Sequence, residues 1–328
     1  MILVTGGTGF LGRFIVDELR QRGEEVRILA RNPAKARAIF GAETVDIAEG
    51  DLLDQLAVEK ALAGVDKVVH AAAVVSFWKR RRPEMRQVNV DGTELLANLC
   101  LDRGIQQFVH VSSVAALGRT GNPGVIDESA KWSKSKLNTY YGRTKFLAEL
   151  RVLRAVQEGL PAVMVNPGVI IGPGDWQAGP PKIFQTIYKG LKYYNPGTVG
   201  VVAAVDVARA IAGLLDSGLH AGERHVLVSD SLPYRQFFGW VAEGLGTQAP
   251  QRIPPAWLMR LTARLLQFLG NLRNREPLIT PETARISRAH SEYDGSKITQ
   301  VIDFQYSDIR EAILATGQQF LQEHGRDA

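Results

Sequence analysis

Tyr141 and Lys145 stand four residues apart in the segment Tyr141-Gly142-Arg143-Thr144-Lys145. On a helix this spacing puts both side chains on one face, one turn apart. A phenol releases its proton near pH 10 in water, which is too high for easy proton transfer at neutral pH. A nearby ammonium group stabilises the phenolate and lowers the pKa of the phenol. The pair therefore predicts a Tyr that acts as a general acid or base, with an ordinary surface pair as the alternative.

A second chemical signal lies at the start of the chain, in the run Thr5-Gly6-Gly7-Thr8-Gly9-Phe10-Leu11-Gly12. It follows an apolar segment, residues 2–4, and precedes an amphipathic one, residues 10–22. Glycines let a backbone turn tightly and approach phosphate groups, and the N-terminus of a helix offers free N–H groups and the positive end of a dipole. In this strand–turn–helix context the run predicts a site for the pyrophosphate of a nucleotide, with a plain tight turn as the alternative.

Together with Ser112-Ser113 at the end of a predicted strand, these motifs resemble the extended branch of the short-chain dehydrogenase/reductase superfamily. That branch has TGxxGxxG at its N-terminus, a Ser after the fifth strand and YxxxK on the next helix. The resemblance is strong up to about residue 230 and loose over the C-terminal third. It implies that Ser113, Tyr141 and Lys145 are catalytic, because the family places the catalytic hydroxyl at the second Ser. Ser113 would hold the substrate oxygen, and Lys145 would also bind the nicotinamide ribose.

The resemblance also implies a dinucleotide site along the carboxyl ends of the strands. Besides Tyr141 and Lys145, its expected contacts are Gly6, Thr8, Gly9, Phe10, Leu11, Gly12, Arg31, Asp51, Leu52, Ala71, Ala72, Ala73, Ser112, Pro167, Gly168 and Val169. Asp51 and Leu52 would meet the adenine, although Asp51 could instead cap the turn that follows it. Residues 167–169 would pack against the nicotinamide. His70 and Asn89 are expected to be structural.

Arg31 bears on the choice of cofactor. In NAD-preferring folds of this kind, an acidic residue after the second strand binds the ribose hydroxyls. Here the segment is Ala30-Arg31-Asn32-Pro33, and a guanidinium can bind a 2′-phosphate through two hydrogen bonds. The sequence therefore favours NADP(H). NAD(H) is the alternative, in which case Arg31 is an ordinary exposed residue.

The segment between Ser113 and Tyr141 narrows the resemblance to the dihydroflavonol-reductase group, through residues 127–129 and 132–133. Sugar-nucleotide enzymes generally have a proline just before the catalytic Tyr, where this chain has Thr139 and Tyr140. The resemblance thus implies an NADPH-dependent reductase of a ketone or aldehyde. Pocket candidates, which could equally be ordinary core, are Val75, Ser76, Phe77, Trp78, Trp176 and the segment from Ile183 to Tyr188.

Two other functions stay open. One is a nucleotide-sugar epimerase or dehydratase, which would use the same three catalytic residues but keep NAD tightly bound. The other is a non-catalytic NADP-binding scaffold or sensor. The complete set of Ser113, Tyr141 and Lys145 argues against the second.

The composition is that of an ordinary globular enzyme: 328 residues, 45% hydrophobic and 22% charged, with a net charge of +5. The single cysteine, Cys100, excludes a disulfide framework or a cysteine-based metal site within one chain and points to a reducing, cytoplasmic setting. The sequence shows no cluster of metal ligands. The densest basic run, Lys79-Arg80-Arg81-Arg82, is typical of a solvated loop rather than of a nucleic-acid site, because no nucleic-acid-binding motif accompanies it.

Neither a signal peptide nor an apolar stretch of the ~20 residues needed to cross a membrane is visible. Residues 257–269 form an amphipathic, basic segment. Such a helix could lie on a membrane surface, but it more often packs its apolar face on a substrate pocket or a partner. Many relatives dimerise through the helices that correspond to residues 84–103 and 137–158, so a homodimer is possible.

The elements that must position these groups alternate along the chain. Strands are predicted at residues 2–5, 25–30, 44–48, 67–72, 107–111 and 162–165, and helices at 10–22, 33–40, 54–63, 84–103 and 137–158. Short unbroken apolar strands are typical of a parallel sheet buried on both faces. We therefore expect a doubly wound, Rossmann-type α/β fold.

In this interpretation residues 1–170 form the NADP-binding domain, joined by a returning strand near 223–229. Residues 171–328 form a smaller, mostly helical and partly discontinuous substrate lobe. Its expected helices are residues 234–244, 255–269, 281–287 and 307–323.

Overall fold

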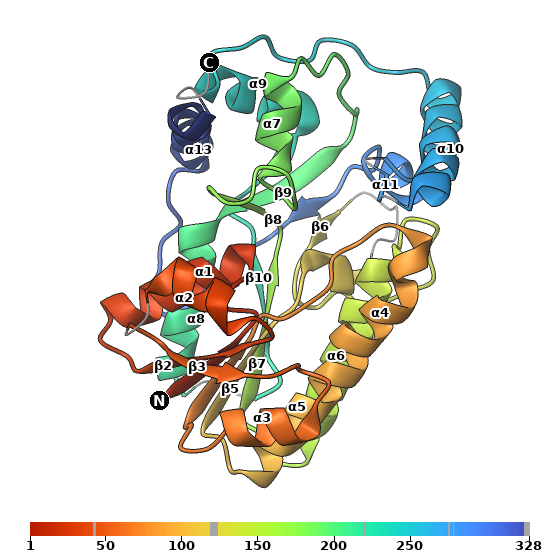
Figure 1. Cartoon of the computed structure of the whole chain (residues 1–328). Coiled ribbons are helices and arrows are strands. Elements are labelled where there is room, and N and C mark those ends of the chain that lie inside the picture. Colours follow the sequence, from red (N-terminus) through yellow and green to blue (C-terminus); the bar gives the residue numbers. More distant parts are fainter. Residues whose placement is uncertain (42–43, 119–123, 219–220, 275, 278, 325–328) are drawn as a thin grey trace.

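A seven-stranded parallel sheet forms the centre of the computed structural model, which describes residues 1–328 except 42–43, 119–123, 219–220, 275, 278 and 325–328 (Figure 1). In spatial order its strands are β10 (Arg224–Leu227), β7 (Ala162–Pro167), β5 (Gln107–Val111), β4 (Lys67–His70), β1 (Ile2–Thr5), β2 (Val26–Ala30) and β3 (Asp46–Glu49). All six neighbouring pairs are parallel. The expected Rossmann-type fold is confirmed.

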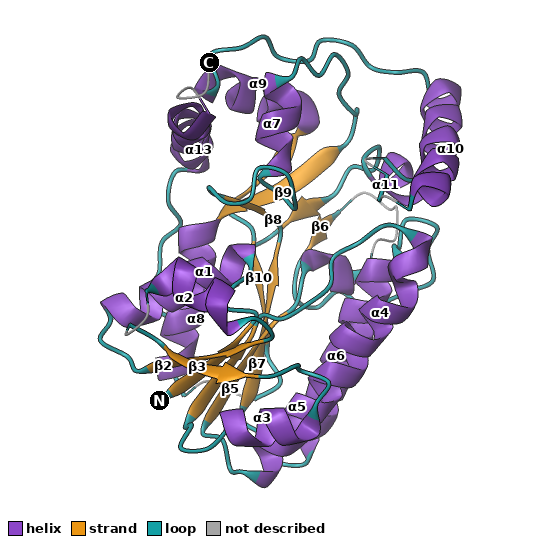
Figure 2. Cartoon of the chain, viewed as in Figure 1, coloured by secondary structure: helices purple, strands orange, loops and turns teal. Residues whose placement is uncertain are grey.

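Helices cover both faces of this sheet, as Figure 2 shows. Alternate side chains of a strand point to opposite faces, so Val4 packs with one layer and Leu3 with the other. The layer on the Val4 face contains α1 (Phe10–Gln21), α2 (Pro33–Phe40) and α8 (Ala204–Asp216). The layer on the Leu3 face contains α3 (Gln55–Ala61), α5 (Gly92–Asp102) and α6 (Tyr140–Gln157). Cys100 of α5 lies in this second core, as a small buried residue.

Two features of these layers differ from the expected elements. The helix expected at residues 84–103 is broken into α4 (Arg82–Arg86), a π-helical turn η2 (Gln87–Asp91) and α5. The turn contains Asn89, whose side chain bonds both the N–H and the carbonyl of Val74. Helix α8 was not expected. It is apolar on most sides because it packs against both the sheet and α1.

The C-terminal part holds a second sheet that the sequence did not reveal, in the order β11 (Asp230–Pro233), β9 (Thr198–Ala203) and β8 (Val169–Ile171). β8 has only three residues, β9 contains a Gly and β11 ends in a Pro, which weakens the strand pattern of this segment. Helices α7 (Lys182–Tyr188), α9 (Tyr234–Gly244) and α13 (Ile309–His324) share an apolar core with this sheet. The lobe is mostly helical, as expected, and this small sheet is the part of it that was not expected.

Smaller elements complete the described chain. They are η1 (Lys79–Arg81), η3 (Val114–Leu117), β6 (Val125–Ile126), α10 (Ala256–Arg273), α11 (Pro281–Ile286), β12 (Glu292–Tyr293) and α12 (Lys297–Val301). Strands β6 and β12 pair in parallel, although they are far apart along the chain. No helix in the described ranges combines the length and apolarity needed to cross a membrane.

Candidate active site

Ser113 and Tyr141 are brought together by the way α6 starts. Ser113 follows β5 and is the N-cap of η3, while Tyr141 lies in the first turn of α6, which Thr139 caps. A Cβ on Gly142 would come within 2.6 Å of the Ala115 carbonyl oxygen, so only glycine lets the first turn of α6 rest directly on η3. The side chains of Ser113 and Tyr141 are hydrogen-bonded as a result. The sequence interpretation did not identify Gly142 as a residue that shapes the site, although its position directly after Tyr141 was an available signal.

The phenol of Tyr141 is fully protonated at neutral pH. Burial raises the pKa of Tyr141 to about 12, and the hydrogen bond with Ser113 opposes this rise only in part. The expected lowering of this pKa by Lys145 together with an oxidised nicotinamide stays a prediction. The ring of Phe77 lies edge-on to Tyr141, with 6.2 Å between the ring centroids.

Lys145 is completely buried beneath the end of β5. Its Nζ donates a hydrogen bond of 2.7 Å to the Val111 carbonyl and lies 3.5 Å from His110 Nε2. Burial lowers the pKa of Lys145 to about 8, against the opposing effect of the Glu149 carboxylate. Its ammonium is therefore still mostly charged at pH 7 but loses its proton in mildly basic solution. A group in this condition can bind a ribose hydroxyl and take part in moving a proton.

The histidines beside Lys145 add no positive charge to the site. Burial, followed by the charge of Lys145, lowers the pKa of His70 to about 3 and holds that of His110 well below its usual range. The His70 ring bridges Thr5 and Thr93, at 2.7 Å and 2.9 Å from their hydroxyl oxygens. This bridge joins the end of β1 to the first turn of α5.

Glu149 anchors a buried polar network that the sequence interpretation missed. Its Oε1 accepts hydrogen bonds from Ser112 Oγ at 2.5 Å and from Asn166 Nδ2 at 2.6 Å, and its Oε2 lies 3.0 Å from Arg224 Nη2. One carboxylate on α6 thus ties together β5, β7 and β10. The hydroxyl of Ser112, a residue expected to contact the cofactor, belongs to this network. The available signal was the spacing of Tyr141, Lys145 and Glu149, which stand four apart on one helix face.

The backbone of the glycine-rich turn is packed so closely against neighbouring backbone that side chains would clash there. Gly6 has φ +74° and a Cβ there would come within 2.6 Å of Ala72 N, at the end of β4. A Cβ on Gly12 would overlap the carbonyl oxygen of Gly6. Gly9, the N-cap of α1, has no capping side chain, and the first turn of α1 has no acidic residue. Thr8, Gly9, Phe10 and Leu11 border this open helix end, which suits an anionic group.

The other expected cofactor residues, which follow the neighbouring strands, lie in different environments. Arg31 is exposed at the end of β2, with its guanidinium 3.9 Å from the Asp51 carboxylate. Asp51 also accepts a hydrogen bond from the Leu53 N–H, so it fixes its own turn. Leu52 packs into the apolar core beneath Gly92. Ala71, Ala72 and Ala73 are partly exposed directly after β4.

Residues 167–169 join the two sheets. Pro167 ends β7 and Val169, which is exposed, begins β8. A Cβ on Gly168 would come within 2.5 Å of the Gly200 carbonyl oxygen, so the residue between these strands must be small. The small sheet is thereby held against the carboxyl edge of the large one.

Of the candidate substrate residues, the structure brings Phe77 to the Tyr141 ring. Trp78 is buried and donates a 2.7 Å hydrogen bond from Nε1 to Asn271 Oδ1, at the end of α10. Trp176 lies in the core of the C-terminal lobe, edge-on to Phe184 and Phe320.

The remaining substrate candidates lie either in loop 75–78 or beside the core of the C-terminal lobe. Tyr188 contacts Phe320, and Ile183 packs against the same core. Ser76 donates a 2.5 Å hydrogen bond to Glu276, and Val75 is exposed. Loop 75–78 therefore meets both Tyr141 and the end of α10, whereas Trp176 and Ile183 pack in the core of the lobe and Tyr188 is half exposed beside Phe320.

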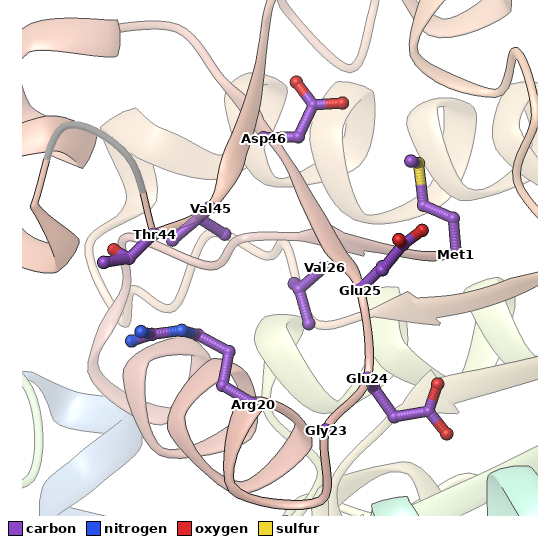
Figure 3. Close-up of a pocket in the computed structure, with 9 residues that line it drawn as sticks. All are labelled: Met1, Arg20, Gly23, Glu24, Glu25, Val26, Thr44, Val45 and Asp46. Atoms are coloured by element: carbon purple, nitrogen blue, oxygen red, sulfur yellow. The ribbon is translucent and has the colours of Figure 1, made fainter.

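A hollow of about 670 Å³ lies at the opposite end of the molecule (Figure 3). Its lining includes Met1, Val26 and Asp46, which stand where β1, β2 and β3 begin. Nucleotide sites in open parallel sheets lie outside the carboxyl ends of the strands. A second hollow of about 480 Å³ lies beside α8 and α12 and includes Arg209 and Asp303. Neither contains a residue of the candidate active site.

The comparisons with known proteins agree with this arrangement. Residues 2–227 match the model of a family described as NAD dependent epimerase/dehydratase. A Synechocystis protein that carries the name of a dihydroflavonol 4-reductase is 30% identical over 98% of this chain and 94% of its own. Sterol demethylase protein B of Methylococcus capsulatus is 31% identical over 98% of both.

Solved structures show the same fold. The crystal structure of gox2253 has a TM-score of 0.83 and 29% identity over 99% of both chains. The Thermus thermophilus UDP-glucose 4-epimerase, in complex with NAD, has a TM-score of 0.76 and 23% identity over 97% of this chain and 98% of its own. With most of its length matched by the family model, the chain belongs to the NAD dependent epimerase/dehydratase family, the extended branch of the short-chain dehydrogenases/reductases.

Proposed function

We propose that this protein is an NADPH-dependent carbonyl reductase that converts a ketone or aldehyde into an alcohol. The observation that carries the proposal is the hydrogen-bonded pair of Ser113 and Tyr141, with a phenol that stays protonated at neutral pH. Ser113 would donate a hydrogen bond to the carbonyl oxygen. Tyr141 would transfer its proton to that oxygen as the negative charge develops there.

The residues present suit a dinucleotide. The backbone of the glycine-rich turn is packed too closely to admit a Cβ at Gly6 or Gly12, and the uncapped N-terminus of α1 offers N–H groups to a pyrophosphate. Lys145, held below Tyr141 on the same helix face, would bind the nicotinamide ribose. When bound, the reduced nicotinamide supplies the hydride for the carbonyl carbon. The proton and the hydride together account for both hydrogens that a carbonyl gains.

Arg31 supports the phosphate-bearing form of the cofactor. It is exposed at the end of β2, and its partner Asp51 stands 3.9 Å away. An exposed pair at this distance contributes at most about 1 kcal/mol, so a phosphate can replace the carboxylate at little cost. The names of the relatives support an apolar substrate with a carbonyl or hydroxyl group, since they include a 3-beta-hydroxysteroid dehydrogenase and a sterol-4-alpha-carboxylate 3-dehydrogenase.

The second candidate is a nucleotide-sugar epimerase or dehydratase. It is favoured by the structural neighbours, several of which are described in complex with NAD and a nucleotide sugar or nucleotide. Such an enzyme would use the same Ser113, Tyr141 and Lys145 but regenerate its cofactor within each cycle.

Two measurements separate the candidates. The first identifies the nucleotide released from freshly purified, denatured protein by mass spectrometry, with and without prior dialysis. The second measures Kd for NADPH and NADH and turnover with a panel of apolar ketones and aldehydes. The proposal expects a cofactor that dialysis removes, tighter binding of NADPH than of NADH, and turnover with at least part of the panel. NAD that survives dialysis would overturn it in favour of the epimerase.

The variant Arg31→Glu sharpens the cofactor assignment. It should weaken NADPH binding at least about tenfold and change NADH binding by no more than about twofold, because a carboxylate repels the 2′-phosphate. Arg37→Glu, on the exposed side of the neighbouring α2, is the matched control. Equal weakening by both variants would mean that Arg31 has no specific role.

A further inference from the structure

Helix α10 reverses the usual distribution of side chains on a surface helix. The side facing the protein has Met259, Ala263 and Gly270, of which the first two form a small cluster with Ala284 of α11. The opposite side has five large apolar residues, between 54% and 67% exposed. We call them the α10 stripe: Trp257, Leu261, Leu265, Phe268 and Leu272.

The stripe is continuous along the helix. Its members are spaced by four, four, three and four residues, which keeps them on one face over the whole length of α10. Of the 17 large apolar residues that are exposed in the described part of the chain, six lie on α10, the sixth being Leu258. Scattered exposed apolar residues are normal, whereas a contiguous patch marks a surface that another body covers.

The charges on α10 itself are all of one sign. Helix α10 contains Arg260, Arg264 and Arg273 and no acidic residue. Arg264 stands three residues after Leu261 and four before Phe268, so it borders the stripe directly. An Arg in this position can keep its guanidinium at a polar headgroup while its apolar stem lies beside the buried stripe.

The first half of the basic run extends this charge, whereas Arg81 and Arg82 pair with Glu276 and Glu282. Arg80 Nη1 donates a 3.1 Å hydrogen bond to Asn274 Oδ1, directly after α10, and Lys79 is exposed beside it. Trp78 holds the same end of the helix through Asn271. Figure 1 shows α10 at the periphery next to α11, away from α9 and α13. The stripe and its basic border therefore face outward together.

We infer that α10 docks on the surface of a membrane that contains anionic lipids, with the α10 stripe in the interface and the arginines at the headgroups. An amphipathic helix with an apolar face, basic flanks and a Trp is suited to lie in the plane of such an interface. A second copy of the chain fits less well, because pairing two α10 helices through their stripes would bring arginines together without acidic partners. The sequence left open whether this apolar face covers a pocket or a membrane, and its exposure favours the membrane.

The test measures binding of the full-length protein to vesicles, so it is independent of cofactor and substrate. Vesicles of phosphatidylcholine are compared with vesicles in which about a third of the lipid is phosphatidylglycerol, by flotation and by the fluorescence shift of Trp257. We expect binding to the anionic vesicles, weakened by salt, and loss of the fluorescence shift in Trp257→Phe.

Two sets of variants identify the contact. The triple variant Leu261→Gln, Leu265→Gln, Phe268→Gln should weaken binding at least about 30-fold, since each residue loses its apolar transfer energy. Arg260→Gln and Arg264→Gln should each cost about fivefold on anionic vesicles and little on neutral ones. The matched control is Leu56→Gln, Leu150→Gln, Val205→Gln, which removes three exposed apolar residues elsewhere and should leave binding unchanged.

Absence of vesicle binding, or equal binding by the triple variant and the wild type, would overturn the inference. Sedimentation of the same proteins detects the rival occupant. If the triple variant splits a dimer and the wild type ignores vesicles, the stripe is an interface between copies of this chain, and the membrane assignment is wrong. If the oligomeric state is the same in both and binding follows the stripe, the assignment stands.

Discussion

The candidate active site and helix α10 break the ordinary rules of burial in opposite directions. Near Tyr141, a lysine and a glutamate are fully buried, with their partners supplied by strand ends. On α10, five large apolar residues stand in solvent. A buried charge costs free energy unless it is paired, and an exposed apolar stripe forgoes the free energy of its burial. The sheet and its helix layers must supply the stability that both regions give up.

The two regions also differ in how many elements they hold together. Glu149 alone connects α6 with three strands, so its network is part of the fold as well as of the site. The attachment of α10 includes a cluster of three small or flexible side chains and the hydrogen bonds of Trp78 and Arg80. Substitutions should therefore lower the free energy of unfolding strongly in the Glu149 network and only slightly on the exposed face of α10.

The largest effect is expected for Glu149→Leu. Removing the carboxylate leaves Arg224 without its partner and takes the acceptor from Ser112 and Asn166, so the free energy of unfolding should fall by about 3–5 kcal/mol. Urea denaturation followed by circular dichroism measures it. Glu158→Leu, which breaks the exposed pair with Arg154 on the same helix, is the control and should change stability by less than about 1 kcal/mol. Similar losses in both variants would contradict the structural role of Glu149.

Tyr141→Phe should reduce turnover by at least about 100-fold, which corresponds to about 2.7 kcal/mol in the activation barrier. It removes the proton but keeps the ring against Phe77, so the Kd for NADPH should change by less than about twofold. Steady-state kinetics with the best substrate and a fluorescence titration give both numbers. Tyr140→Phe, the adjacent ring, is the matched control and should keep most of the activity. Unchanged turnover in Tyr141→Phe would remove the phenol from the mechanism.

The third effect depends on pH. Because the pKa of Lys145 falls from its ordinary 10.5 to about 8 on folding, the unfolded chain binds a proton between these values that the folded chain lacks. Stability should therefore rise with pH from about 8 to about 10, by at most about 1.4 kcal/mol per pH unit from this group. Above pH 10 the raised pKa of Tyr141 acts in the opposite sense, since the folded phenol keeps a proton that the unfolded one releases.

The variant Lys145→Met isolates this contribution. The unfolding free energy of the wild type should rise relative to that of the variant as the pH goes from 8 to 10, because the wild type loses the cost of a buried charge. A difference that is constant over this range would mean that Lys145 keeps its proton in the folded state.

The smallest effect should come from Leu265→Gln on α10, which should change the free energy of unfolding by less than about 0.5 kcal/mol. Its side chain is exposed and supports no core. Met259→Gln, six residues earlier on the buried side, should cost at least about 1 kcal/mol. Thermal denaturation of both variants compares the two faces of the same helix. Equal losses would mean that the stripe packs against the protein.

Much of the large sheet was predictable from the sequence, because each short apolar strand ends at a turn signal and each helix keeps its period. The predicted helix at residues 234–244 matches α9 to the residue. The small sheet and α8 were not predictable in the same way. Strands β8 and β11 are too short for periodicity to register, β9 is interrupted by Gly200, and most of the residues of α8 are apolar and buried.

At the site, the residue types were predictable and their electrostatics were not. Local spacing placed Tyr141 and Lys145 on one helix face. The direction of the Lys145 ammonium depends on the Val111 carbonyl, which belongs to a strand 34 residues earlier. The partners of Glu149 likewise come from β5, β7 and β10, so that only the assembled sheet defines them.

The position of β10 has a further consequence, because the ribosome makes the chain from its N-terminus and β10 therefore emerges late. Strand β7 is synthesised well before β10, the strand that pairs with its open edge, and before α8, which covers part of the apolar face of the sheet. Until residue 227 has emerged, a nascent chain presents an unpaired parallel edge and an incomplete apolar layer. Folding of the nucleotide-binding half must therefore wait for the second half of translation, and premature termination would release an aggregation-prone fragment.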